Sequence, residues 1–464
     1  MSYIISTDAF KTTFAVAPDG RRLTHHSGKR IKVFPFNTTQ QSTSPAVETF
    51  DSLIGYYLTL IDGINPKFLS KDELIERLEE ETEIEPGKED LFRGAVSQLF
   101  FENGQLRSLN LRMREYMPCV EPAEKRIAEY LVDVLGDCGC LRRHMKEALR
   151  NLEMRSNVLE GLIISKLEAE DNKAREELHY SRITDALKTV FEQDFEYILA
   201  SEIRTRDYLV PLLEFYYFSY TAQACLQLNR FDDGDPQSNR PIYFCLDWEK
   251  TSQSRLCFTE GWQRLESSLD KMFAHIITLE ILNQTESSDQ FDYVKLIRMA
   301  DTSAEEDARI SGQIRQLTTM YRNAIDCAQM RELTPSAHPR GKTASEIRFL
   351  FDSVRVQFEM TDRRKPYSSY AEKFERFCKR NYLKFRGRSG FMLNISEETL
   401  VFLTKICVKE QEKLRLKDVF CEFERRGVFF DSISQEQIAQ YFEKLNLIEK
   451  KSDSGDAKYV KRIL

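Results

Sequence analysis

The chain has 464 residues, of which 41% are apolar and 30% are charged, and it carries a formal net charge of −7. This composition belongs to a globular protein and excludes a long disordered or repetitive chain, and a guide of about 150 residues per domain predicts about three domains. The ten cysteines follow no disulfide pattern, and the first 20 residues lack the charged and apolar regions of a signal peptide, so we expect free thiols in the cytoplasm.

The sequence predicts a mainly α, helical multi-domain protein. Residues 1–46 contain β-prone pieces separated by turns, and they predict an extended arm. From Val47 onward the pattern becomes helical, and residues 47–205 are predicted to form a helical domain. Ser70 and Glu73 have the spacing of a capping box at the start of one helix. The predicted helices cover 47–62, 70–81, 88–101, 106–117 and a nearly continuous helical hairpin over 122–205.

A second helical domain is predicted over 206–342. Its apolar segment 209–228 is nearly long enough to cross a bilayer, but Pro211 and Glu214 favour a buried helix, so we expect no membrane partner. An insert at 229–255 contains a loop and the β-prone run "PIYFCLDWE". Further helices are predicted over 260–284, 302–333 and 343–360.

Residues 343–394 are predicted to form basic amphipathic helices and a linker. Within them, residues 361–394 hold ten Lys or Arg against three acids. Residues 361–394 therefore carry a net charge of +7, and residues 395–464 are neutral. Because the whole chain carries −7, the first 360 residues must carry −14. This concentration of positive charge favours a nucleic-acid partner. The cations expected to contact DNA are Lys379, Arg380, Lys384, Arg386 and Arg388.

Aromatic side chains interleave with these cations. At this spacing they predict the buried side of an amphipathic helix, with a base-stacking surface as the alternative. The segment "KFRGRSG" (384–390) holds two glycines and three cations, which predicts a flexible loop that follows phosphates; a solvated linker is the other interpretation.

The last 70 residues, 395–464, follow the order helix, strand, helix, turn, helix and two strands, which predicts a winged helix. Ser396 can cap the first helix, Gly427 can end the second, and Ser434 with Gln437 has the spacing of a capping box for the third. Because this segment has 13 basic and 13 acidic residues, docking to another protein stays open as an alternative to DNA binding. The predicted DNA contacts of the third helix and the wing are Gln435, Gln437, Gln440, Lys444, Lys450, Lys451, Lys458, Lys461 and Arg462.

Catalytic chemistry has little support in the sequence. "GKT" (341–343) ends like a phosphate-binding loop, but Ser336 replaces the required glycine, so we expect no nucleotide and no other cofactor. A cluster of acids could hold Mg²⁺ in a nuclease, although a loop in which aspartates cap turns is the favoured interpretation. The cluster consists of Asp232, Asp233, Asp235, Asp247 and Glu249.

Several unusual strings occur together in this chain. They are "FDDGDPQSNRPIYFCLDWEKTSQSR" (231–255), "KFRGRSGFMLNIS" (384–396), "FERRGVFFDS" (423–432) and "LNLIEKKSDSGDAKYV" (445–460). Through them, most of residues 200–464 resembles DptG, the middle-sized component of bacterial phosphorothioation-dependent restriction systems. The resemblance implies a subunit of a complex that attacks DNA lacking a sulfur mark, with ATPases as companion proteins.

Two functions therefore remain open. In the first, the protein is a non-enzymatic subunit that binds double-stranded DNA and holds ATPase components of the same restriction system. In the second, it is a metal-dependent nuclease of that system and uses the acids between Asp232 and Glu249.

Overall fold

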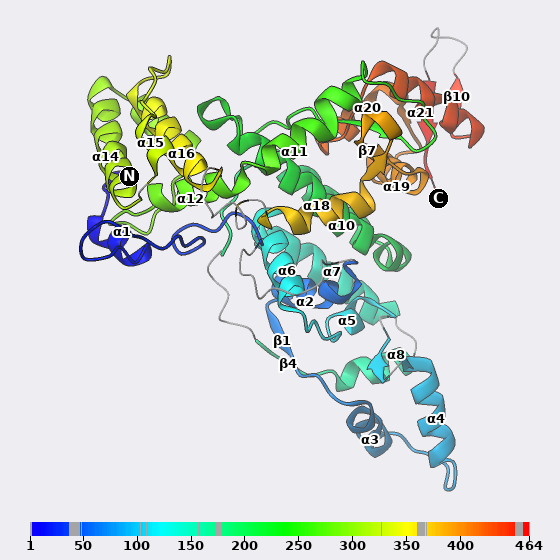
Figure 1. The fold of residues 1–464 in the computed structure, drawn as a ribbon. Coiled ribbons are helices and arrows are strands. Elements are labelled where there is room, and N and C mark those ends of the chain that lie inside the picture. Colours follow the sequence, from blue (N-terminus) through cyan, green and yellow to red (C-terminus); the bar gives the residue numbers. More distant parts are fainter. Residues whose placement is uncertain are drawn as a thin grey trace. The chain divides into compact units, whose positions relative to one another are not determined.

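The protein is mainly α-helical with small sheets, as the sequence predicts (Figure 1). It divides into two compact units. Residues 47–179 and 187–218 form the smaller unit, and residues 1–46, 180–186 and 219–464 form the larger unit. The computed structural model describes residues 2–36, 47, 49–102, 104–107, 109–155, 158–171, 179–325, 327–359, 367, 369–450 and 458–463.

The smaller unit consists of helices with two pairs of short antiparallel strands. Its helices are α2 (Asp51–Asp62), α3 (Lys71–Glu81), α4 (Glu89–Phe100), α5 (Leu111–Arg114), α6 (Pro122–Val134), α7 (Cys138–Arg155), α8 (Val158–Lys166), α9 (Lys188–Leu199) and the first part of α10 (Glu202–Leu228). The paired strands are β1 (Ile64–Pro66) with β4 (Ala169–Asp171), and β2 (Phe101–Glu102) with β3 (Gln105–Leu106).

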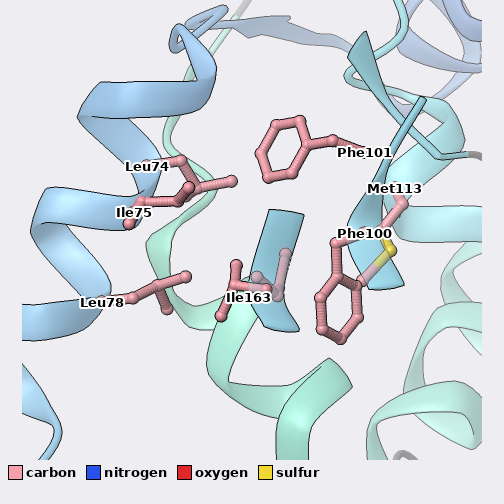
Figure 2. Close-up of a cluster of buried hydrophobic side chains, with 8 residues drawn as sticks. Leu74, Ile75, Leu78, Phe100, Phe101, Met113 and Ile163 are labelled. Atoms are coloured by element: carbon pink, nitrogen blue, oxygen red, sulfur yellow. The ribbon is translucent and has the colours of Figure 1, made fainter. Parts of the chain in front are cut away.

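Helix α3 shows how the sequence forms an element of this unit. The predicted capping box is confirmed, since Ser70 Oγ accepts from the N–H of Glu73 at 3.3 Å and the Glu73 carboxylate accepts from the N–H of Ser70 at 2.8 Å. The apolar residues of α3 recur at helical spacing and face side chains of α4, β2 and α8 (Figure 2). This buried cluster contains Leu74, Ile75, Leu78, Val96, Phe100, Phe101, Met113 and Ile163.

Two helix predictions in the smaller unit are wrong. Segment 106–117 contains only the short helix α5, because the chain first turns between β2 and β3 at Gly104, where φ is +79°. The long helical hairpin predicted over 122–205 does not form, since this range contains several shorter helices and a strand. Gly136, at φ +74°, lies between α6 and α7. After α8 the chain forms strand β4, which pairs with β1.

The larger unit combines helices with two small sheets. Its helical elements are α1 (Thr7–Thr13), the last part of α10, η1 (Phe231–Asp233), η2 (Phe258–Trp262), α11 (Gln263–Leu269), α12 (Met272–Leu282), α13 (Tyr293–Ala300), α14 (Ala304–Asn323), α15 (Ala328–Arg331), α16 (Lys342–Glu359), α18 (Glu372–Asn381), η3 (Gly387–Ser389), α19 (Glu397–Val408), α20 (Leu416–Arg425) and α21 (Ser432–Lys444). Its strands are β5 (Tyr243–Leu246), β6 (Leu383–Phe385), β7 (Phe391–Ile395), β8 (Lys413–Arg415), β9 (Phe429–Phe430), β10 (Ile448–Lys450) and β11 (Lys458–Lys461).

The apolar segment 209–228 is helical and mostly buried, as predicted, and it forms the greater part of α10. Within the smaller unit, the carboxylate of Glu214 accepts from the N–H of Phe50 at 3.3 Å. Over the described part of the chain, no helix combines the length and the apolar character that crossing a bilayer requires.

The β-prone arm predicted for the amino terminus does not form a sheet of its own. Among its described residues, 2–36, the chain forms helix α1 and an isolated bridge from Ile5 to Thr285. Tyr3 Oη donates to a carbonyl of α12 at 2.9 Å, and the buried carboxylate of Glu280 accepts two backbone N–H groups of the arm at 2.9 and 3.1 Å. The described arm therefore combines helix α1 with irregular chain, and it is held to α12 and to the turn that follows it by side-chain and backbone bonds.

Candidate nucleic-acid interface

Two of the three predicted helix boundaries near the carboxyl terminus are confirmed. Helix α19 begins after Ser396, whose Oγ accepts from the N–H of Thr399 at 3.1 Å. Gly427 follows α20 at φ +79°. A Cβ at Gly427 would lie 2.9 Å from Ser219 Oγ of α10, so both the left-handed backbone and the close approach of α10 require glycine here.

The third boundary differs from the prediction. The capping box expected from Ser434 and Gln437 does not form, because Asp431 is the N-cap of α21 and its Oδ1 accepts from the N–H of Ser434 at 3.0 Å. The hydroxyl of Ser434 donates to Glu249 at 2.8 Å instead. Helix α21 therefore begins at Ser432 and includes Ser434 in its first turn.

Strands β8, β10 and β11 form an antiparallel sheet in the order β10-β11-β8. Val460 lies opposite Ile448 on one side and Leu414 on the other, and its side chain is buried. The alternating pattern at the end of the sequence thus produces a hairpin, and the short strand after α19 pairs with its last strand.

A second sheet joins distant parts of the larger unit. Its strand order is β6-β7-β5-β9, with β5 parallel to both β7 and β9 and with β6 and β7 forming an antiparallel hairpin. Strand β5 comes from the predicted insert at 229–255, while β9 lies between α20 and α21. The apolar run of the insert predicts a strand, but its partners could not be predicted from spacing.

A buried ionic network ties the insert to α21. Arg255 donates to both oxygens of Asp431, at 2.7 and 2.8 Å, to Ser434 Oγ at 3.0 Å, and to the carboxylate of Glu249. The three charged side chains are at most 8% exposed. Burial alone would raise the pKa of Asp431, but the bonds from Arg255 and Ser434 outweigh it, so the pKa lies below its ordinary value.

Two of the predicted DNA contacts bind the end of β5 instead. Arg386 donates to the carbonyl of Leu246 at 2.7 Å, to Asn394 Oδ1 at 2.9 Å, and to the carbonyls of Glu249 and Asp247 at 3.2 and 3.4 Å. Lys384 Nζ donates to the Asp247 carbonyl at 2.9 Å and lies 3.3 Å from its carboxylate. Lys384 and Arg386 therefore hold the β6–β7 hairpin against β5.

The rest of "KFRGRSG" forms the tip of that hairpin rather than a flexible loop. Arg388 is exposed there and its side chain has no partner among the described residues. Phe385 and Phe391, 64% and 39% exposed, flank the tip with ring centroids 5.5 Å apart. Of the aromatics interleaved with cations, those of α18 are buried as predicted, whereas these two face solvent.

The α18 cations lie beside this hairpin. Lys379 Nζ lies 3.9 Å from Glu375 and 5.7 Å from the ring centroid of Phe391. Arg380 is exposed and also makes a contact within the protein. Both cations remain accessible, but a phosphate would have to displace the existing contact of each.

One face of α21 is occupied by the insert. Ser434 and Tyr441 are seven residues apart and so lie on the same face. Ser434 bonds Glu249, and the Tyr441 ring lies 4.7 Å from the ring of Trp248. Gln437 lies between them on that face and is half-buried.

The remaining predicted contacts of α21 differ in accessibility. The amide of Gln435 donates to the carbonyl of Phe430 at 3.1 Å. Gln440 is exposed and reaches Glu436 at 3.4 Å, while Lys444 is exposed without a partner in the described ranges. Of the four side chains nominated on this helix, Gln440 and Lys444 are thus the ones open to a ligand.

The wing cations mostly form surface ion pairs. Lys450 and Lys458 approach Glu443 at 3.3 and 3.1 Å, and Arg462 pairs with Glu410. Lys461 is exposed and unpaired within the part of the chain that the structure describes. Lys451 lies outside the described residues.

The acids of the nuclease interpretation do not converge. Asp232 is buried and pairs with Arg348 at 2.5 Å, Asp235 accepts from Ser238 Oγ at 2.6 Å, and Glu249 belongs to the Arg255 network. Across the described ranges, no three His, Cys, Asp or Glu side chains gather as a metal site. This arrangement favours the interpretation in which the aspartates cap turns and form ion pairs.

Neither a family model nor a curated protein matches this sequence. The functional assignment therefore depends on the geometry above and on the resemblance of the quoted strings. Sequence reasoning missed Arg255, because a lone arginine in a polar run gives no sign that it is buried between two carboxylates.

We expect Arg255→Met to lower the free energy of unfolding by about 3–5 kcal/mol, because it leaves Glu249 and Asp431 buried without their cation. Chemical denaturation measures this loss. Arg376→Met is the matched control, since its ion pair with Glu372 is on the surface and should matter little.

The stability difference between wild type and Arg255→Met should depend on pH. The depressed pKa of Asp431 means that its ion pair stabilises the protein above the unfolded-state pKa, about 4, and that this stabilisation is lost as pH falls further. The difference between wild type and Arg255→Met should therefore shrink below about pH 4. A difference that stays constant down to acid unfolding would contradict the network.

We expect Arg386→Met to cost about 2–4 kcal/mol of stability, since it leaves several carbonyl acceptors at the end of β5 without a donor. Arg388→Met, two residues away at the exposed tip, should leave the denaturation midpoint unchanged. Equal effects of the two substitutions would show that Arg386 does not hold the hairpin.

Proposed function

We propose that this protein is a non-catalytic subunit that binds double-stranded DNA and acts as a scaffold in a phosphorothioation-dependent restriction complex. The complex would act in the cytoplasm against unmodified DNA, and ATPase partners would supply its motor activity. The observation that carries the proposal is the order α19, β8, α20, α21, β10 and β11, with β8 paired to β11. This order and pairing fit a winged helix, in which α21 would be the helix placed in the major groove.

The DNA-contacting surface that we propose is narrower than the full set of side chains predicted from the sequence. Its central cations are Arg388, Lys444 and Lys461, which are exposed and unpaired in the described ranges. Lys450 and Lys458 would add to them as members of accessible ion pairs with Glu443. Such pairs contribute only about 0–1 kcal/mol, so a phosphate can replace their carboxylate partner.

Lys384 and Arg386 have a different role in this proposal. Their bonds to the end of β5 fix the β6–β7 hairpin and thereby position Arg388 at its tip.

The scaffolding part of the proposal depends on charge distribution and on the resemblance to DptG. The first 360 residues carry a net −14, so the acidic body would repel DNA and leave it to the carboxyl-terminal elements. That body is the part proposed to bind the ATPase components.

The test is the salt dependence of duplex affinity, measured by fluorescence anisotropy. For Arg388→Gln/Lys444→Gln/Lys461→Gln, we expect weaker binding and a slope of log K against log salt that is shallower by about 2 to 3, since each lost phosphate contact removes about 0.9.

The control is Arg143→Gln/Lys146→Gln/Arg150→Gln, which removes three exposed charges from α7 of the smaller unit. This control should bind DNA as the wild type does. If the two triple variants have the same slope, the proposed surface is wrong; if the wild type does not bind the duplex, the DNA-binding proposal itself fails.

A further inference from the structure

An open cavity of about 810 Å³ lies in the larger unit, where the loop after α1 meets the end of α14 and α15. Among its described lining residues, four are arginines and one, Asp19, is an acid. The arginines are Arg21, Arg22, Arg322 and Arg331.

Arg322 is half-buried and has neutral partners. Its guanidinium donates to Ser353 Oγ at 3.1 Å and to the carbonyls of Met330 and Leu333 at 2.7 and 3.4 Å, and it lies 4.7 Å from the ring centroid of Phe349. Burial lowers the pKa of Arg322, and no carboxylate of the described residues pairs with it. A cation held this way, away from part of its water, is stabilised by an anion that enters beside it.

A folded loop brings Arg21 and Arg22 to the same cavity. The N–H of Ala17 donates to the Arg22 carbonyl at 2.9 Å, and Gly20, at φ +69°, makes the turn between them. Just after the loop, His25 bonds Tyr321 Oη of α14 at 2.9 Å. The backbone is thus fixed, while both arginine side chains are exposed and have no partner in the described part of the chain.

We infer that this cavity binds a small ligand with two or three linked phosphate groups, such as a nucleoside diphosphate or triphosphate. Guanidinium groups match phosphate oxygens in bidentate geometry, and several of them suit a ligand that carries several negative charges. The volume is within the range of about 300–1,000 Å³ that small-molecule sites occupy.

Among the described residues, two features oppose an anion here, and each is partly offset. Asp19 lines the cavity, but its carboxylate accepts from the N–H of Arg21 at 3.0 Å. The carboxyl end of α14 contributes about half a negative charge, which solvent and salt screen.

The experiment is isothermal titration of the full-length protein with pyrophosphate, ADP and ATP, each separately and at low salt. We expect at least one of them to bind and Arg21→Gln/Arg22→Gln to weaken its affinity about tenfold, which corresponds to the loss of one to two exposed charge-assisted contacts. Both residues lie on an exposed loop, so the variant should retain the denaturation midpoint of the wild type.

The control Arg143→Gln/Lys146→Gln removes two exposed charges elsewhere and should bind like the wild type. The inference is overturned if none of the three ligands binds at about 1 mM, or if Arg21→Gln/Arg22→Gln binds as tightly as the control. Citrate binding as tightly as ATP would overturn the phosphate class. Because Arg21 and Arg22 are outside the proposed DNA surface, their variant should bind duplex DNA normally, so the two proposals fail separately.

Discussion

A guanidinium buried between two carboxylates determines how the larger unit is assembled. Arg255 links Glu249, at the end of β5, to Asp431, the N-cap of α21, and Ser434 completes the set of partners. Opening this contact would expose the three charges to solvent or leave them buried without a partner. Either change costs far more free energy than opening an exposed ion pair. The insert that carries β5 is therefore fixed to the carboxyl-terminal helices, and β5 can pair with both β7 and β9.

That attachment explains how the chain uses its positive charge. The segment with the strongest basic character contains Lys384 and Arg386, yet the structure places both on the end of β5. Among the described residues, exposed cations lie on α18, at the hairpin tip, on α21 and on the wing. A DNA contact made by these elements would depend on a small number of well-placed charges rather than on the total charge of the segment.

Sequence patterns predict the local structure of this protein well where one signal dominates. The Ser70 capping box, the Ser396 cap and the left-handed Gly427 follow from short-range chemistry and are confirmed. The cap of α21 was misplaced because Asp431 and Ser434 both offer oxygens in the correct spacing, and the choice depends on Glu249, which is 185 residues away.

The candidate DNA-binding residues were harder to predict, because their burial also depends on residues far away in the sequence. Which arginines are buried depends on contacts between segments distant in the sequence, such as the one between Arg386 and Leu246. The β-prone arm illustrates this too, since several of its bonds go to α12 and to the turn after it, which are more than 200 residues away in the sequence. The four predicted boundaries between the five domains remain predictions.

Amide hydrogen exchange of the full-length protein, with and without a duplex of unmodified DNA, tests whether the carboxyl-terminal elements contact DNA. We expect DNA to slow exchange at residues 387–390, 440–450 and 458–463, while β5 exchanges slowly in both states because it lies inside a sheet. Protection that is absent from these three segments, or that appears only in the smaller unit, would show that these elements do not bind DNA.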